Sequence, residues 1–176
     1  MTLLDECESC YFDANGLQQH YWRWGDKNAP TIILLHGIRS YGKTWLKTAA
    51  RLKDTYQVIA LDLRGRGNSG WSKDAAYYYG DYVADLEGLV AHLSLDEFYL
   101  LGHSLGGQNA LLYAAKHPSH VKGLIVEDIG PGSSTGGEGA ARIVREFNNT
   151  PESFDSWQAA TDFWRSIRPK ISDESL

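Results

Sequence analysis

The chain has 176 residues, of which 43% are hydrophobic and 22% are charged, and its formal net charge is −5. This composition is ordinary for a soluble globular protein with a substantial core, and the negative charge argues against nucleic acid or an anionic membrane as the main partner. No apolar run approaches the ~20 residues that a membrane-spanning helix needs, and the acidic segment 1–10 does not resemble a signal peptide. We therefore expect a cytoplasmic protein.

Two cysteines lie near the N-terminus, as Cys7-Glu8-Ser9-Cys10. A redox pair with this spacing normally opens a helix that follows a strand, and a zinc site would need two further ligands. Neither context is present in the sequence. We expect two free thiols, and no metal.

Six segments have the hydrophobic pattern of β-strands. The first two are joined by Asn15-Gly16, a dipeptide typical of a tight hairpin turn. The continuous apolar runs at 31–35 and 57–61 indicate strands that are buried on both faces. The six predicted strands are 9–13, 17–24, 31–35, 57–61, 98–101 and 123–129.

Helical patterns alternate with these strands, at 44–53, 78–93, 138–148 and 153–168. A further helix-forming run, 110–116, belongs to a helix that Leu105 opens. Strand–helix alternation favours an α/β fold with an open, mostly parallel sheet and helices on both faces. Ligands bind at the carboxyl ends of the strands in such sheets. We therefore expect His36-Gly37, Asp62, Ser104 and Asp128, which follow four of the strands, to converge. A Ser/Gly-rich linker at 132–139 divides the chain into a core, 1–131, and a helical part, 132–176.

The segment 100–107 contains the pattern Gly-x-Ser-x-Gly at 102–106. With a predicted strand before it and a predicted helix after it, this pattern indicates a nucleophile elbow, a tight turn that raises a serine hydroxyl above the sheet edge. Side chains at Gly102 and Gly106 would collide with the neighbouring strand and helix. Ser104 is therefore the predicted nucleophile.

Three motifs in this order resemble the α/β-hydrolase superfamily, and within it the esterase branch with a helical cap after the sixth strand. They are His36-Gly37, then Asp62-x-Arg64-Gly65-x-Gly67-x-Ser69, then Gly102-His103-Ser104-Leu105-Gly106-Gly107. The resemblance implies a serine hydrolase with an oxyanion hole formed by the backbone N–H groups of Ile38 and Leu105, and no cofactor. It also implies an eight-stranded sheet and a lid formed by the helices of the cap, with the substrate bound between the two. We expect Asp62 and Arg64 to hold a loop rather than to touch substrate.

The resemblance also implies a histidine general base, held in the family by the last two strands, which have no counterpart in this sequence. No histidine follows Asp128. His117 ends the helix after Ser104, which places it ~20 Å away, and we expect His103 to be packed and hydrogen-bonded. The chain therefore resembles the first two-thirds of such an enzyme, and a second chain or self-association could supply the remainder.

Two assignments keep alternatives open. Asp128 could orient the missing histidine, or it could cap the turn into Gly130-Pro131. A stripe of aromatic residues in 153–168, with Trp157 and Trp164, could line a substrate pocket or could pack its helix against the rest of the protein.

The sequence thus predicts a hydrolase that cleaves a small-molecule carboxylic ester through an acyl-enzyme on Ser104. The serine excludes haloalkane dehalogenases and epoxide hydrolases, whose chemistry needs a carboxylate at this position, whereas carbon–carbon bond hydrolases stay open. The alternatives are a non-catalytic ligand-binding module and an inactive fragment.

Overall fold

The computed structural model describes residues 7–130 and 138–171. The chain forms two compact units, Met1–Ser133 and Ser134–Leu176, and each is described by itself.

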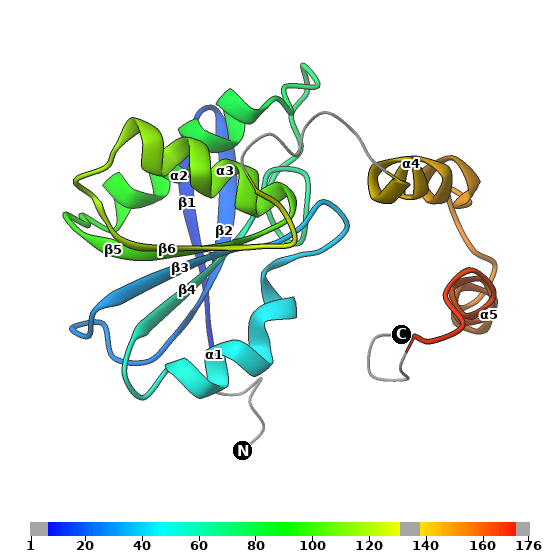
Figure 1. The fold of residues 1–176 in the computed structure, drawn as a ribbon, viewed down its shortest axis with the longest axis horizontal. Helices are drawn as coiled ribbons and strands as arrows, with labels where there is room; N and C mark the ends of the chain where they lie inside the picture. The colour runs from blue at the N-terminus through cyan, green and yellow to red at the C-terminus, as the bar shows by residue number, and fades with distance from the viewer. Residues whose placement is uncertain (1–6, 131–137, 172–176) are drawn as a thin grey trace. The chain divides into compact units, whose positions relative to one another are not determined.

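The first unit is built on a six-stranded sheet with the order β1-β2-β4-β3-β5-β6 (Figure 1). The strands β1 and β2 form an antiparallel hairpin, β2 is antiparallel to β4, and the other neighbours are parallel. The predicted mostly parallel sheet is confirmed, with strand ends within two residues of those expected. The strands are β1 Glu8–Ala14, β2 Leu17–Trp24, β3 Thr31–Leu35, β4 Gln57–Asp62, β5 Phe98–His103 and β6 Val121–Glu127.

Helices cover both faces of this sheet. The helix α1 (Leu46–Leu52) lies on one face, and α2 (Tyr79–His92) and α3 (Leu105–Lys116) lie on the other (Figure 1). Side chains of successive residues in the central strands point to opposite faces of the sheet. Ile33 packs in the hydrophobic cluster under α2 and α3, and Ile32 packs in the hydrophobic cluster beside α1. The double burial predicted for β3 and β4 is therefore confirmed.

The starts of α1 and α3 add detail to the prediction. A 3₁₀ turn, Gly42–Trp45, precedes α1. The helix α3 starts at Leu105, beside Ser104 as predicted, and its first turn holds Gly106 and Gly107, which have low helix propensity and precede the helix-forming run 110–116.

The hairpin turn and the cysteines behave as predicted. Asn15 and Gly16 have φ angles of 52° and 74°, the backbone of a tight turn whose twist matches that of the strands. Cys10 packs against the cluster under α2 and α3, whereas Cys7 packs against the cluster beside α1. The two cysteines therefore lie on opposite faces of the sheet, and neither is in a disulfide.

The second unit contains α4 (Glu138–Asn149) and α5 (Trp157–Ile167). The latter begins four residues after the predicted start because the Ser156 hydroxyl accepts a hydrogen bond from the Ala159 N–H at 3.1 Å and caps the helix. The predicted linker at 132–139 falls almost wholly outside the described residues. Within the described ranges, no helix is both long enough and apolar enough to span a membrane.

Candidate active site

Ser104 lies at the junction of β5 and α3 in a strained backbone conformation, with φ 51° and ψ −115°. Residues other than glycine rarely adopt a positive φ, and such strain clusters at functional sites. The Ser104 N–H donates to the Glu127 carbonyl at 3.0 Å, and the Ser104 carbonyl accepts from the Gln108 N–H at 3.0 Å. The Ser104 hydroxyl has no hydrogen-bond partner among the described residues. The backbone is thus anchored while the side chain stays available.

Two glycines make this turn possible, as the sequence predicts. A Cβ atom on Gly102 would lie 2.3 Å from the Gly106 carbonyl oxygen, in the first turn of α3. A Cβ atom on Gly106 would lie 2.3 Å from the Leu35 carbonyl oxygen, on the neighbouring strand β3. The strand and the helix therefore approach each other more closely than any side chain would allow.

The loop after β3 lies against the serine turn. A Cβ atom on Gly37 would lie 2.7 Å from His103 Nδ1 and 3.5 Å from the Ser104 Cβ. The next residue, Ile38, lines a pocket of about 720 Å³ together with Leu105. The structure thus brings together the two residues predicted to form the oxyanion hole.

His36 orients the peptide that carries the Ile38 N–H. Its Nδ1 donates to the Gly37 carbonyl at 2.7 Å, and its Nε2 accepts from the Leu63 N–H at 3.0 Å. In a trans peptide the carbonyl and the N–H point to opposite sides, so a fixed Gly37 carbonyl also fixes the direction of the Ile38 N–H. Burial lowers the pKa of His36 to about 4, against the opposing effect of the bond to Gly37. The ring is therefore neutral near pH 7.

Arg66 holds the following peptide, a role that the sequence did not reveal. Its Nε donates to the Ile38 carbonyl at 2.9 Å, and its Nη1 donates to the Gly65 carbonyl at 2.7 Å. His36 and Arg66 therefore hold the carbonyls on both sides of Ile38. The sequence feature that could have indicated this role is the position of Arg66, a cationic residue within a glycine-dense loop at the end of a strand.

Aromatic side chains form much of the 720 Å³ pocket wall, and they come from the segment that leads into α2 and from the start of that helix. They are Trp71, Tyr77, Tyr78, Tyr79 and Tyr82. Trp157 and Trp164, predicted from the sequence to bind substrate, belong to the second unit. Trp157 is 80% exposed, and Trp164 meets the ring of Phe163 edge-on with a centroid distance of 5.3 Å. Their contact with substrate stays a prediction.

Asp128 lies at the same sheet edge as Ser104, directly after β6. It has a φ of 73°, and its Oδ2 lies 3.8 Å from His103 Nε2, with the two side chains 61% and 41% exposed. The expected hydrogen bond of His103 is not found within the described residues, where Asp128 lies beyond hydrogen-bond distance. The ring packs over Gly37, which has no side chain, and stays partly exposed.

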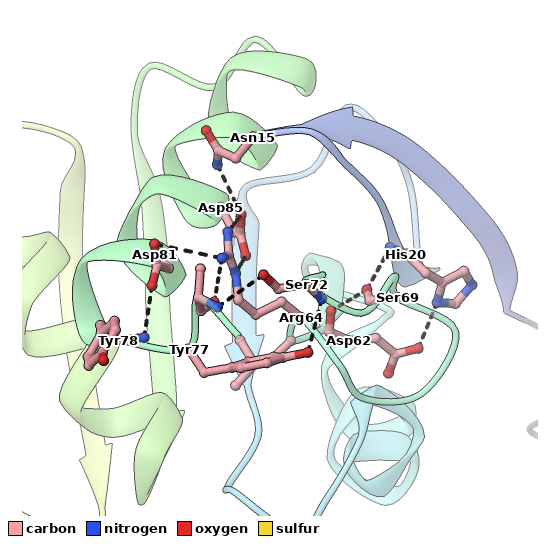
Figure 2. A network of polar contacts seen from close by, with 12 residues as sticks. Asn15, His20, Asp62, Arg64, Ser69, Ser72, Tyr77, Tyr78, Asp81 and Asp85 are labelled. Carbon is pink, nitrogen blue, oxygen red and sulfur yellow. Dashed lines mark hydrogen bonds and ion pairs between the residues drawn. The ribbon is translucent and has the colours of Figure 1, made fainter. Parts of the chain in front are cut away.

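The loop after β4 uses its polar groups internally (Figure 2). Asp62 accepts hydrogen bonds from His20 Nδ1 at 2.8 Å, from the Gly42 N–H at 2.5 Å and from the Asn68 N–H at 3.0 Å. Burial alone would raise its pKa, but these hydrogen bonds outweigh burial and lower it. Arg64 donates two hydrogen bonds of 2.6 Å to Asp85. These contacts give Asp62 and Arg64 the loop-holding role expected from the sequence.

The four strand ends meet, as predicted. The Leu63 N–H bonds His36, Gly37 lies against Ser104, and Ser104 bonds the carbonyl of β6 before Asp128. The remaining histidines are engaged elsewhere. His20 pairs with Asp62, His92 stacks on Phe12, His117 Nε2 lies 2.6 Å from Glu87, and His120 Nδ1 lies 3.1 Å from the Tyr113 hydroxyl.

Comparison with known proteins agrees with this geometry. Residues 30–173 match the family model described as alpha/beta hydrolase fold. N-formylmaleamate deformylase from Pseudomonas putida is 39% identical over 122 residues, which cover 68% of this chain and 45% of the relative. The sn-1-specific diacylglycerol lipase ABHD11 from Mus musculus is 36% identical over 120 residues, which cover 64% and 37% of the two chains.

Among solved structures, an alpha/beta hydrolase from Novosphingobium aromaticivorans matches with a TM-score of 0.83 and 29% identity, covering 95% of this chain and 60% of the other. Further relatives are named as an epoxide hydrolase and a proline iminopeptidase. The relatives are thus hydrolases of several kinds. The chain belongs to the α/β-hydrolase superfamily, and it spans about half the length of the curated relatives that it matches.

Proposed function

We propose that this protein hydrolyses carboxylic esters through an acyl-enzyme on Ser104. The observation that carries the proposal is the serine itself, a strained residue at the carboxyl end of β5 that lies against the loop of Gly37 and Ile38. Its hydroxyl has no hydrogen-bond partner among the described residues. A structural serine in such a turn would be expected to bond its neighbours through its hydroxyl.

In the proposed reaction, Ser104 Oγ attacks the ester carbonyl carbon while a general base takes the hydroxyl proton. The resulting oxyanion accepts hydrogen bonds from the N–H groups of Ile38 and Leu105, and Leu105 opens α3, where the helix dipole favours negative charge. The tetrahedral intermediate collapses, the alcohol leaves with the proton from the base, and water then releases the acid by the same route in reverse. Loss of one oxyanion donor typically lowers the rate by ~10²–10³.

We propose a histidine outside residues 1–176 as the general base and Asp128 as the acid that orients it. The sheet offers a place for the missing part, since β6 forms one edge of the described sheet and its Ile125 side chain is 56% exposed. An open edge pairs readily with another strand. We propose that a further segment or a second chain pairs here, and that the active protein is cytoplasmic.

A second candidate is hydrolysis of an amide, favoured by the 39% identity to a protein named as a deformylase. The same serine, oxyanion hole and acyl-enzyme serve both reactions, and the leaving amine takes the place of the alcohol. Epoxide opening is disfavoured despite the relative of that name, because that chemistry needs a carboxylate where this chain has Ser104.

The test uses the full-length protein, a fluorophosphonate probe, p-nitrophenyl acetate and p-nitroacetanilide. We expect stoichiometric labelling and ester turnover, both lost in Ser104→Ala and both retained in Ser153→Ala, a change at an exposed serine in the second unit. Faster cleavage of the anilide than of the ester would favour the amide candidate. A folded wild-type protein that is neither labelled nor active would contradict the proposal and support a ligand-binding module.

A further inference from the structure

A second cleft adjoins the pocket of Ile38 and Leu105. It measures about 760 Å³, lies between the loop that follows β3 and the loop that follows β4, and shares Arg66 and Trp71 with the first pocket. A single ligand can therefore extend from the cleft into the pocket, in contact with the Arg66 side chain.

The charge of this cleft is opposite to that of the protein. Three cationic side chains, Arg39, Lys43 and Arg66, line it, against the single acid Asp62. That acid is 1% exposed and is already bonded to His20 and to two backbone N–H groups. In a chain whose formal net charge is −5, Asp62 therefore leaves the charges of Lys43 and Arg66 unbalanced within the lining of this cleft.

Two of the three cations are held in place without a carboxylate partner among the described residues. Lys43 Nζ lies 3.9 Å from the centroid of the Trp22 ring, and Arg66 is fixed by the Ile38 and Gly65 carbonyls. Cations that are positioned by aromatic rings and carbonyls keep their charge available for a ligand.

The walls of the cleft are aromatic and open to solvent. Trp71 is 69% exposed and Tyr41 is 49% exposed, and both line the cleft. Exposed aromatic side chains beside fixed cations match a ligand that joins an anionic group to an apolar or planar body.

We propose that this cleft binds the anionic group of the substrate, a carboxylate or a phosphate on an apolar or planar body. The bond to be cleaved then lies in the adjoining pocket at Ser104. This inference rests on the proposed function for its chemistry, but binding of the anion needs only the cleft.

Binding is measured first, by tryptophan fluorescence of the full-length Ser104→Ala protein with benzoate, phenyl phosphate and benzyl alcohol. We expect benzoate, phenyl phosphate or both to bind more tightly than benzyl alcohol. The anion that binds more tightly shows whether the cleft prefers a carboxylate or a phosphate. The Kd of that anion should rise about tenfold in Lys43→Met and return in Lys43→Arg, as expected for loss of one charge-assisted contact. The matched control is Lys122→Met, which removes the same charge from the start of β6, outside the cleft, where Lys122 pairs with Glu97 at 3.0 Å.

Kinetics in the wild-type background separates this inference from the proposed function. Lys43→Met should lower kcat/KM about tenfold for an anionic ester, mono-p-nitrophenyl succinate or 4-acetoxybenzoate, and leave p-nitrophenyl acetate unchanged. Anion binding that depends on Lys43, in a protein without esterase activity, would support the cleft and contradict the proposed function. Ser104-dependent turnover with equal anion binding in Lys43→Met and Lys122→Met would overturn the cleft alone.

Discussion

Two glycine-containing loops follow β4 and β5, which lie on either side of β3 in the sheet, and they use their polar groups in opposite ways. In the loop 62–69, Asp62 is enclosed by hydrogen bonds and Ser69 bridges the His20 N–H and the Asp62 carbonyl. In the turn 102–107, the backbone is fixed by close contacts and the Ser104 hydroxyl is left without a partner among the described residues. A glycine-rich motif at a strand end thus marks a close approach of backbones, and the state of its polar side chain distinguishes a structural loop from a reactive one.

The largest expected effect comes from making the same change in both loops. Ser104→Ala should lower ester turnover by at least ~10³-fold and leave the free energy of unfolding almost unchanged. Ser69→Ala should lower the free energy of unfolding by about 1–3 kcal/mol, because it leaves the buried His20 N–H without its acceptor. Steady-state kinetics and urea denaturation of both variants measure the contrast. Equal losses of activity without loss of stability would show that the two loops do not differ as described.

A second comparison sets two glycines against each other. Gly106→Ala should destabilise the protein by about 3 kcal/mol or more, since the new Cβ meets the Leu35 carbonyl at 2.3 Å. Gly16→Ala should cost only about 1–2 kcal/mol, because its Cβ meets nothing within 4 Å and the strain lies only in its φ of 74°. Thermal denaturation of the two variants decides this; a Gly106→Ala protein as stable as Gly16→Ala would mean that the turn and β3 are not tightly apposed.

The pH dependence of stability sharpens the role of His36. Its pKa is lowered from 6.5 in the unfolded chain to about 4 in the fold, so the unfolded state binds the extra proton first as the pH falls. The stabilisation from the neutral ring is complete above pH 6.5 and is lost progressively down to about pH 4, by about 3 kcal/mol in all. The lowered pKa of Asp62 adds a further loss only below pH 3.8, the ordinary pKa of an aspartate. Urea denaturation between pH 4 and pH 7 should show the free energy of unfolding fall with pH in the wild type. The decrease that is due to His36 should be absent in His36→Asn.

The smallest expected effect concerns Arg66. In Arg66→Lys the charge remains, but the planar fork that holds the Ile38 and Gly65 carbonyls is lost. We expect kcat for the neutral p-nitrophenyl acetate to fall on the order of tenfold with little change in KM, because the oxyanion donor is misplaced rather than removed. An unchanged kcat would contradict the positioning role of Arg66.

The sequence predicted the parts of this fold that depend on local pattern. The apolar runs of β3 and β4, the Asn15-Gly16 turn and the strained serine turn all follow from neighbouring residues. The start of α3 at Leu105 was also predicted, although glycines at 106 and 107 oppose the helix locally and only the approach of β3 explains Gly106. The role of Arg66 was missed because its partner carbonyl at Ile38 lies 28 residues earlier in the chain. The predicted hydrogen bond of His103 is not found among the described residues, where Asp128 Oδ2 lies 3.8 Å from its Nε2.

The strain at Ser104 sets stability against activity at one position. A glycine would adopt a φ of 51° without penalty, so Ser104→Gly would give a protein that is more stable by a fraction of the ~1–2 kcal/mol of left-handed strain and yet has no nucleophile. Screening variants of this protein for thermostability alone would therefore enrich inactive ones at position 104, and any such screen has to keep a functional readout.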